Sequence, residues 1–389
     1  MPSVTSRRQD NLSRRRLEFW VPQFGAEEKA LVARVIDSGF INDGEVTAQF
    51  EKRMAELLGC KHVIATTSGT TAIFLALAGI GVGVGDEVIV PDVTFIATAN
   101  AVTLTGAKPV LVDIEPKRLT LDPQRAEDAI TARTKAIVPV HVSGRAADLD
   151  SILDIANRHD LFVVEDAAEA LFSKHDGKAL GTFGIAGCFS LSPNKTLTTG
   201  QGGLIATDDD RLQSRLRELK DQGRPVRGTG GDDVHSSIGF NFKFTNLQAA
   251  VGLAQLKDVE RRLSRMRSIY TGYAEGLRDV KGISTLPFRI EDGEVPQWTD
   301  VLAEHCHELY DHLASKGIRG RRFWHPLHTQ KPYRMPNDRF PNSLKYIPRA
   351  MWLPSAFTLS DADVVTVCDE IRQFLAHVPA GRQPVESTV

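Results

Sequence analysis

The sequence predicts an α/β fold with a mostly parallel sheet flanked by helices, followed by a smaller C-terminal α+β domain. Short runs of Val, Ile and Leu alternate with helical patterns through the first half of the chain. Continuous apolar strands of this kind are typical of parallel sheets that helices cover on both faces. The 389 residues are enough for a large domain and a second, smaller one.

The elements of the first half follow one another in regular order. Leu31, Val32 and Val35 recur at helical spacing before Gly39, and a similar pattern ends at Gly59. The predicted elements, in chain order, are helices 25–38 and 46–58, strand 62–65, helix 72–78, strand 87–90, helix 94–104, strand 109–112, helix 123–130, strand 136–140, helix 149–156 and strand 161–164.

The second half begins with two more strands, one running through 188–189 into Ser190 and one at 204–206, on either side of a glycine-rich turn. A long helix is then predicted from Asn246 to about Leu277, and further helices near 306–315 and 361–376. The predicted division is a flexible basic N-terminal arm (1–18), a large domain (19–245), a linking helix (246–280), a small α+β domain (281–378) and a loose tail (379–389).

Composition argues against several classes of function. A formal net charge of -2 gives no electrostatic case for binding nucleic acid or an anionic membrane. No apolar run approaches the roughly 18 residues that span a bilayer, and the Arg-rich first 18 residues lack the apolar segment of a secretory signal. The four cysteines are far apart, so we expect no disulfide frame, no metal site and a reducing, cytoplasmic location.

Several polar residues directly follow predicted strands. In parallel sheets, ligands bind at the carboxyl ends of the strands. The residues that share this placement are Ser68-Gly-Thr70, Asp92 to Phe95, His141, Asp166 and Lys195. Their common position is the first argument that they line one site.

Each of these residues also has a simpler reading. Ser68-Gly-Thr70 offers backbone N–H groups to an anion at a helix N-terminus, although Ser68 could merely cap that helix. Asp166 could keep a pyridine nitrogen protonated, or could cap the next helix. Phe95 could stack on an aromatic ring, or could belong to the core.

Lys195 lies in the turn between two strands and is followed by Gly200, Gly202 and Gly203. Glycines allow a ligand to approach closely, and an activated lysine amine can form a Schiff base with a carbonyl compound or with pyridoxal phosphate (PLP). A solvated surface lysine is the alternative.

Four parts make up a PLP site, namely a phosphate cradle, a carboxylate for the ring nitrogen, a stacking aromatic ring and an amine nucleophile. All four occur here at strand ends of one α/β domain, and this coincidence favours PLP binding. His325 and His328 are candidates for lining a polar pocket, but they lack the third ligand of a metal site.

These residues lie within motifs that resemble the PLP-dependent sugar aminotransferases of fold-type I in the DegT/DnrJ/EryC1/StrS family. The likeness covers roughly residues 20–378, and its finer features are closest to perosamine-synthase-like members. The motifs are Ser68-Gly-Thr-Thr-Ala72, Gly85-Asp-Glu-Val-Ile-Val-Pro91, Thr94-Phe-Ile-Ala-Thr98, Pro139-Val-His-Val-Ser-Gly144, Glu165-Asp-Ala-Ala-Glu-Ala170, Asn194-Lys195 with Gly200-Gln-Gly-Gly203, and Gly239-Phe-Asn-Phe-Lys-Phe-Thr-Asn246.

The resemblance implies a role for each matching residue. Lys195 would form the Schiff base and move protons, Asp166 would pair with the pyridinium nitrogen, and Glu169 would contact the 3-hydroxyl of the ring. Phe95 would stack on the ring. Gly69, Thr70 and Ser190 would hold the phosphate, as would Asn241, reaching into the site of the neighbouring subunit of a homodimer.

Two positions depart from the family pattern. Lys243 stands where an Arg is common, which removes a planar bidentate fork from any substrate contact. Glu169 stands where many members have Gln, so its protonation matters. Together with Lys243, His325 is a candidate substrate residue.

The activity that the resemblance implies is transfer of an amino group from L-glutamate to a keto sugar, most simply at C4 of a 4-keto-6-deoxy nucleotide sugar. A C3-aminating enzyme and a keto-cyclitol aminotransferase remain alternatives. In PLP-dependent sugar dehydratases of the family a His typically replaces the Schiff-base Lys, so Lys195 argues against that reaction, and the intact set of residues argues against a non-catalytic regulator.

Overall fold

The computed structural model describes residues 16–225 and 233–377. Its larger sheet has seven strands in the order β1-β9-β8-β5-β4-β2-β3. Neighbours from β8 to β3 are parallel, whereas β9 runs antiparallel to both β1 and β8, so the predicted mostly parallel sheet is confirmed. Its strands are β1 (His62–Thr66), β2 (Glu87–Pro91), β3 (Lys108–Val112), β4 (Thr134–Ile137), β5 (Phe162–Asp166), β8 (Ala186–Ser190) and β9 (Gly203–Thr207).

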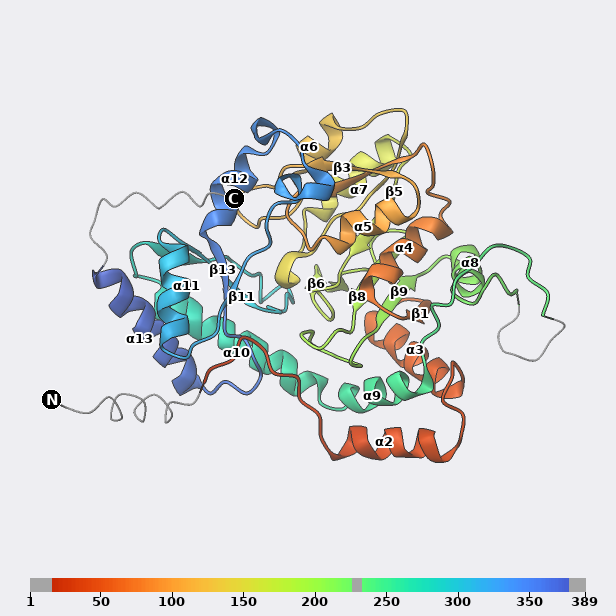
Figure 1. Cartoon of the computed structure of the whole chain (residues 1–389), viewed down its shortest axis with the longest axis horizontal. Helices are drawn as coiled ribbons and strands as arrows, with labels where there is room; N and C mark the ends of the chain where they lie inside the picture. The colour runs from red at the N-terminus through yellow and green to blue at the C-terminus, as the bar shows by residue number, and fades with distance from the viewer. Residues whose placement is uncertain (1–15, 226–232, 378–389) are drawn as a thin grey trace.

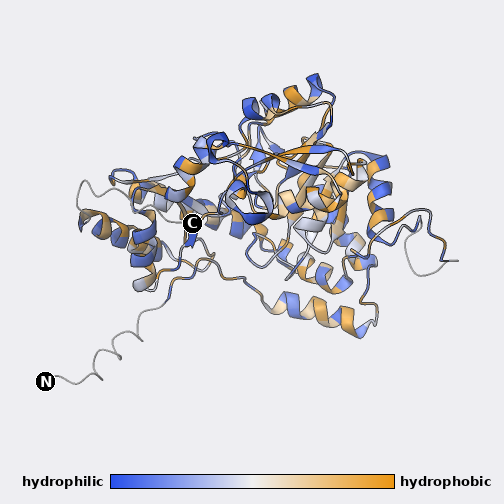
Figure 2. Ribbon diagram, turned by 45° about the horizontal axis from the view of Figure 1, so that its top comes forward, coloured by the Kyte–Doolittle hydropathy of each residue, from blue (hydrophilic) through white to orange (hydrophobic). Residues whose placement is uncertain are grey.

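Helices cover both faces of this sheet, as the continuous apolar strands predict (Figure 1). In β2, Val88 and Val90 pack with α4 and α5, while Ile89 between them packs with α6 and α7 on the opposite face. Apolar residues accordingly gather in the strands at the centre of this part of the molecule (Figure 2). The helices are α3 (Glu45–Leu58), α4 (Gly69–Gly79), α5 (Ala97–Leu104), α6 (Pro123–Asp128), α7 (Leu149–Arg158) and α8 (Asp210–Lys220).

A second sheet of four antiparallel strands has the order β10-β11-β13-β12. Its strands are β10 (Ile283–Thr285), β11 (Thr299–Ala303), β12 (Arg321–Arg322) and β13 (Ala350–Leu353), and it packs with α10 (Val259–Leu277), α11 (Cys306–Ser315) and α13 (Asp361–His377). The remaining elements are α2 (Ala26–Asp37), β6 (Lys174–His175), β7 (Lys178–Ala179), α12 (Pro341–Tyr346) and five 3-10 turns, η1 (Val142–Gly144), η2 (Leu327–Thr329), η3 (Lys331–Tyr333), η4 (Asn337–Arg339) and η5 (Ile347–Arg349).

The predicted linking helix is two helices, so the prediction of a single one from Asn246 to Leu277 is wrong. α9 (Asn246–Leu256) ends before Asp258, whose φ of -110° and ψ of 8° depart from helical values, and α10 starts at Val259. α9 packs against α2 and α3, whereas α10 packs against α13. The pair crosses the lower part of the molecule in Figure 1, with α2 below α9.

Two element boundaries also differ from the prediction. The fourth strand was expected to reach residue 140 but ends at Ile137, and Pro139, which lacks an N–H, lies just beyond it. The helix expected from residue 94 begins at Ala97, because residues 94–96 turn first.

Near the N-terminus, the chain is anchored from Leu17 onward. Leu17 is buried, its N–H donates to the Gly317 carbonyl, and its carbonyl accepts from the Arg319 N–H. Leu17 therefore does not belong to the flexible arm predicted for residues 1–18, while residues 1–15 and the predicted tail lie outside the described part. Within the described part, none of the helices is long and apolar enough to cross a membrane.

The two sheets meet in a buried junction. Trp298, Trp352 and Phe323 from the second part pack with Val93 and Val140 beyond the ends of β2 and β4. The Arg145 guanidinium forms an ion pair with the Asp300 carboxylate of β11, and both side chains are fully buried. This ion pair ties the segment after η1 to the small sheet.

Replacing Asp300 with Ala should lower the free energy of unfolding by about 3–5 kcal/mol, because the Arg145 charge would stay buried without its partner. Urea denaturation followed by circular dichroism measures the change. Glu56→Ala, which breaks an exposed pair with Arg53, is the control and should cost under about 1 kcal/mol. Equal losses in the two variants would contradict the role of the buried pair.

Candidate active site

Three titratable side chains converge at the carboxyl end of the central strands. Asp166 is the last residue of β5, Glu169 lies in the turn that follows, and Lys195 lies in the connection between β8 and β9. All three are buried. The Lys195 Nζ lies 3.2 Å from Glu169 Oε1, and its charge also acts on the Asp166 carboxyl. The reading of Lys195 as a solvated surface lysine is therefore wrong.

The Asp166 carboxyl is oriented by two hydrogen bonds. Its Oδ2 accepts from Thr98 Oγ1 at 2.7 Å and its Oδ1 from the Ala168 N–H at 3.1 Å. Residues 167–173 form turns, so Asp166 does not cap a helix. Burial raises the pKa of this carboxyl, while the hydrogen bonds and the charges of Lys195 and His141 act in the opposite direction.

Glu169 is held between the two sheets. Its Oε2 accepts from the Ser143 N–H at 3.0 Å, and Ser143 Oγ in turn accepts from the indole N–H of Trp352 at 3.0 Å. Burial raises the pKa of Glu169, and the adjacent Lys195 ammonium opposes that shift. Lys195 Nζ also lies 4.8 Å from the centre of the Trp298 ring, so a carboxylate and an aromatic face hold the amine.

The predicted phosphate cradle lies where α4 starts. Ser68 does cap the helix, with its Oγ accepting from the Thr71 N–H at 3.2 Å. Gly69 brings this first turn against the end of β8, since a Cβ at Gly69 would stand 3.0 Å from the Ser190 Cβ. The backbone N–H groups of Gly69 and Thr70 and the Ser190 hydroxyl thus share one small region with the positive end of the helix dipole.

Phe95 precedes α5 and is 53% exposed, so the alternative that it belongs to the core is wrong. Its carbonyl accepts from the Thr98 N–H at 3.2 Å. Since Thr98 also binds Asp166, the exposed ring stands one helical turn from the residue that orients the carboxylate.

Some strand-end residues serve buried contacts instead. The Asp92 carboxylate binds His328 Nδ1 at 2.7 Å, and the His328 ring stacks on Phe340, so His328 does not line a pocket with His325. His141 Nε2 lies 3.0 Å from Glu165 Oε2, and its Nδ1 accepts from the Ala147 N–H. These two buried histidines fix the loops around the site.

Lys243 pairs with Thr66 at the end of β1, and Asn241 pairs with Asp221. Asn241 is exposed, and Lys243 Nζ binds the Asp221 carboxylate at 2.6 Å. The described contacts of Lys243 therefore give it a partner within its own chain rather than a free ammonium for a substrate.

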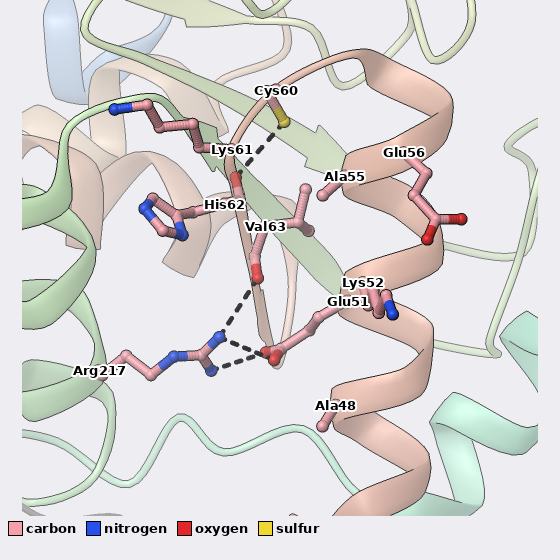
Figure 3. A pocket seen from close by; sticks show the side chains of 10 residues that line it. All are labelled: Ala48, Glu51, Lys52, Ala55, Glu56, Cys60, Lys61, His62, Val63 and Arg217. Atoms are coloured by element: carbon pink, nitrogen blue, oxygen red, sulfur yellow. Dashed lines mark hydrogen bonds and ion pairs between the residues drawn. The ribbon is translucent and has the colours of Figure 1, made fainter.

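Two pockets differ in their relation to these residues. One, of about 360 Å³, is lined by Phe95 and His325 among others. The other, of about 390 Å³, lies between α3 and β1 and contains none of the predicted site residues (Figure 3). There Arg217 binds the Glu51 carboxylate through two N–H groups, so the charges of these two side chains are already paired with each other. Within the described ranges, no cluster of His, Cys, Asp and Glu is arranged to hold a metal ion.

Sequence reasoning missed three residues of the site. Thr98 carried a usable signal, because it closes the motif Thr94-Phe-Ile-Ala-Thr98, which follows a strand, and in the structure its hydroxyl lies 2.8 Å from that of Thr94. Trp298 carried none, since it reaches Lys195 only through the packing of one sheet against the other. Ser143 lies in the motif that ends at Gly144 and reaches Glu169 across the ends of the neighbouring strands β4 and β5.

In protein freed of any cofactor, Asp166→Asn should become more stable relative to the parent as the pH rises above about 4. Folding raises the Asp166 pKa from its ordinary value of 3.8, so the parent loses stability as that carboxyl ionises, and Asn cannot ionise. Urea midpoints at several pH values between 4 and 8 measure the difference, and a difference that shrinks with pH would contradict it.

The chain is similar in sequence and in fold to several known proteins. The sequence model of the DegT/DnrJ/EryC1/StrS aminotransferase family matches residues 22–372. The GDP-perosamine synthase of Caulobacter vibrioides is 38% identical over 92% of this chain and 98% of its own length. The crystal structure of S. venezuelae DesV has 34% identity and a TM-score of 0.87, covering 91% of this chain and 95% of its own.

A further solved structure is the PLP form of the sugar aminotransferase Spr1654 from Streptococcus pneumoniae. It has 25% identity and a TM-score of 0.88, covering 93% of this chain and 99% of its own. The chain therefore belongs to the DegT/DnrJ/EryC1/StrS aminotransferase family and is an aminotransferase whose cofactor is PLP.

Proposed function

We propose that this enzyme transfers an amino group from L-glutamate to C4 of a 4-keto-6-deoxy sugar linked to a nucleotide. The observation that carries the proposal is the buried Lys195 amine between the Glu169 carboxylate and Trp298, beside the strand end of Asp166. The similarity to GDP-perosamine synthase, over nearly the full length of both chains, supports a nucleotide sugar as the acceptor.

The residues of the site fit PLP. The missing Cβ of Gly69 leaves the first turn of α4 close to Ser190, as a phosphate cradle requires. The proposed contacts are the phosphate with Gly69, Thr70 and Ser190, the ring nitrogen with Asp166, the 3-hydroxyl with Glu169, and the face of the ring with Phe95.

The chemistry divides between cofactor and protein. Bound PLP supplies an electron sink for the carbanion left when a C–H proton departs. Lys195 takes that proton from the donor carbon and later delivers a proton to the sugar carbon, as a general base and then a general acid. Asp166 holds the ring nitrogen in its protonated form, and the Thr98 hydroxyl keeps the carboxylate in position.

Glu169 orients the amine between these transfers. Its Oε1 accepts a hydrogen bond from Lys195 at 3.2 Å, and its Oε2 is fixed by the Ser143 N–H. A protonated Glu169 would donate a hydrogen bond to the ring hydroxyl much as the more common Gln would, and burial favours this form by raising the pKa.

A homodimer with shared sites accounts for the exposed apolar residues near Asn241. Phe40, Ile41 and Ile238 are all more than half exposed, and the Phe40 and Ile41 carbonyls accept hydrogen bonds from Asn246 at the start of α9. A second copy covering this surface would bring the exposed Asn241 to the phosphate of the neighbouring site. The four free cysteines are consistent with a cytoplasmic enzyme.

Other reactions remain candidates on the same cofactor chemistry. Amination at C3 and amination of a keto-cyclitol would use the same Lys195 and Asp166. Dehydration is disfavoured because a lysine, not a histidine, occupies position 195, and a regulatory role is disfavoured because the buried catalytic set is intact.

Lys195→Ala should abolish the visible absorbance band of lysine-bound PLP and lower turnover by at least about 10²–10⁴-fold, because it removes the attachment and the proton carrier. Absorbance spectra and release of 2-oxoglutarate measure the two effects. Lys178→Ala, which changes an exposed lysine, is the matched control. A variant at position 195 that kept the band would rule out this assignment.

With glutamate as donor, the enzyme should release 2-oxoglutarate over many turnovers only when a keto acceptor is present, and about one equivalent per site without one. A panel of 3-keto and 4-keto nucleotide sugars with a keto-cyclitol identifies the acceptor, and the 4-keto-6-deoxy sugar should give the highest kcat/KM. Activity on the cyclitol alone, or on a 3-keto sugar alone, would move the assignment to the corresponding alternative.

A further inference from the structure

The pocket of about 360 Å³ lies between the two parts of the chain. One wall comes from residues 94–96, after β2, and the other from β12 and Tyr310 of α11. The wall formed by residues 94–96 is connected to Asp166 through two hydroxyl groups. Thr94 Oγ1 lies 2.8 Å from Thr98 Oγ1, and Thr98 Oγ1 donates to the Asp166 carboxylate. The pocket is therefore linked to Asp166 through Thr94 and Thr98.

The lining of this pocket is cationic and aromatic. Arg321 and Arg322 both contribute to it, and none of the described residues that line it is acidic. Tyr310, Phe323 and Trp324 add aromatic surface. A hollow with positive charge and aromatic walls suits a ligand that combines anionic groups with a flat ring.

Neither of the two guanidinium groups forms a strong ion pair with a described residue. Arg321 lies over the Trp352 ring at 5.5 Å and, among described residues, has no ion-pair partner. Arg322 lies over the Tyr310 ring at 4.9 Å, with only a 3.7 Å approach to the exposed Asp311 carboxylate and a 3.4 Å contact with His307. Exposed ion pairs at such distances are weak, so an anion can replace this one.

We propose that Arg321 and Arg322 bind the diphosphate of the substrate's nucleotide in this pocket, an assignment that rests on the proposed function. Both guanidinium groups belong to residues that line this pocket, and they lie over different rings, Trp352 and Tyr310. Two separated cations suit the two phosphates of a diphosphate better than the single carboxylate of a small donor. The keto sugar then extends toward Phe95 and His325.

Titration calorimetry on the PLP-loaded enzyme tests the assignment with GDP and guanosine as probes. The variants are Arg321→Gln and Arg322→Gln, with Arg319→Gln as the matched control, since Arg319 is exposed on the same segment but does not line the pocket. Each pocket variant should weaken GDP binding about tenfold or more, because a charge-assisted hydrogen bond is lost. The control should bind GDP within twofold of the parent, and guanosine should bind all four proteins equally.

The half-reaction with glutamate separates this proposal from the proposed function. It needs no nucleotide, so both pocket variants should convert the visible PLP band at the parent's rate. Unchanged GDP binding in both pocket variants, or an equal loss in Arg319→Gln, would overturn the diphosphate assignment. Slower conversion with glutamate would overturn it too, because the pocket would then serve the amino donor. A parent that reacts with glutamate and binds GDP but aminates no keto sugar would instead refute the proposed function.

Discussion

The buried ion pair between Arg145 and Asp300 is the contact on which the site depends most. Asp300 stands two residues after Trp298, whose ring faces the Lys195 amine, and Arg145 stands two residues after Ser143, whose N–H holds Glu169. The same ion pair thus joins the two sheets and fixes both groups that contact the lysine. Burying two charges is costly, but breaking the pair would cost more, so the junction is held in one arrangement.

The site itself concentrates buried charge around one amine. Burial raises the pKa values of both Asp166 and Glu169, and Lys195 opposes each shift. Hydrogen bonds from Thr98 and from the Ser143 backbone aim the two carboxyl groups before any ligand arrives. Such preorganisation is useful in catalysis, because the protein need not reorient its dipoles as charge develops.

The sequence predicted those features that depend on local pattern. Strands and helices of the first half followed from apolar periodicity, and placement after a strand singled out Asp166 and Lys195, which the structure brings together. The sequence pattern did not predict features that depend on contacts between segments far apart in the chain. The break at Asp258 follows from α9 and α10 packing against different partners, and Trp298 faces Lys195 only because the second sheet docks there. The segments at Gly69 and Ser190, which we propose to hold the phosphate, meet through a close approach that depends on the fold and not on residue types alone.

The antiparallel course of β9 has a consequence for how Lys195 works. Residues 191–202 leave β8 and return beside it, and the loop is closed at its neck by the hydrogen bond from the Leu191 N–H to the Gly202 carbonyl. The Gln297 side chain binds the backbone on either side of the lysine, because its amide oxygen accepts from the Thr196 N–H and its amide nitrogen donates to the Asn194 carbonyl. Lys195 thus has a flexible side chain on a backbone that hydrogen bonds hold in place. In the role that we propose for Lys195, its amine can move between attachment and release by rotation about four single bonds while the backbone stays in place.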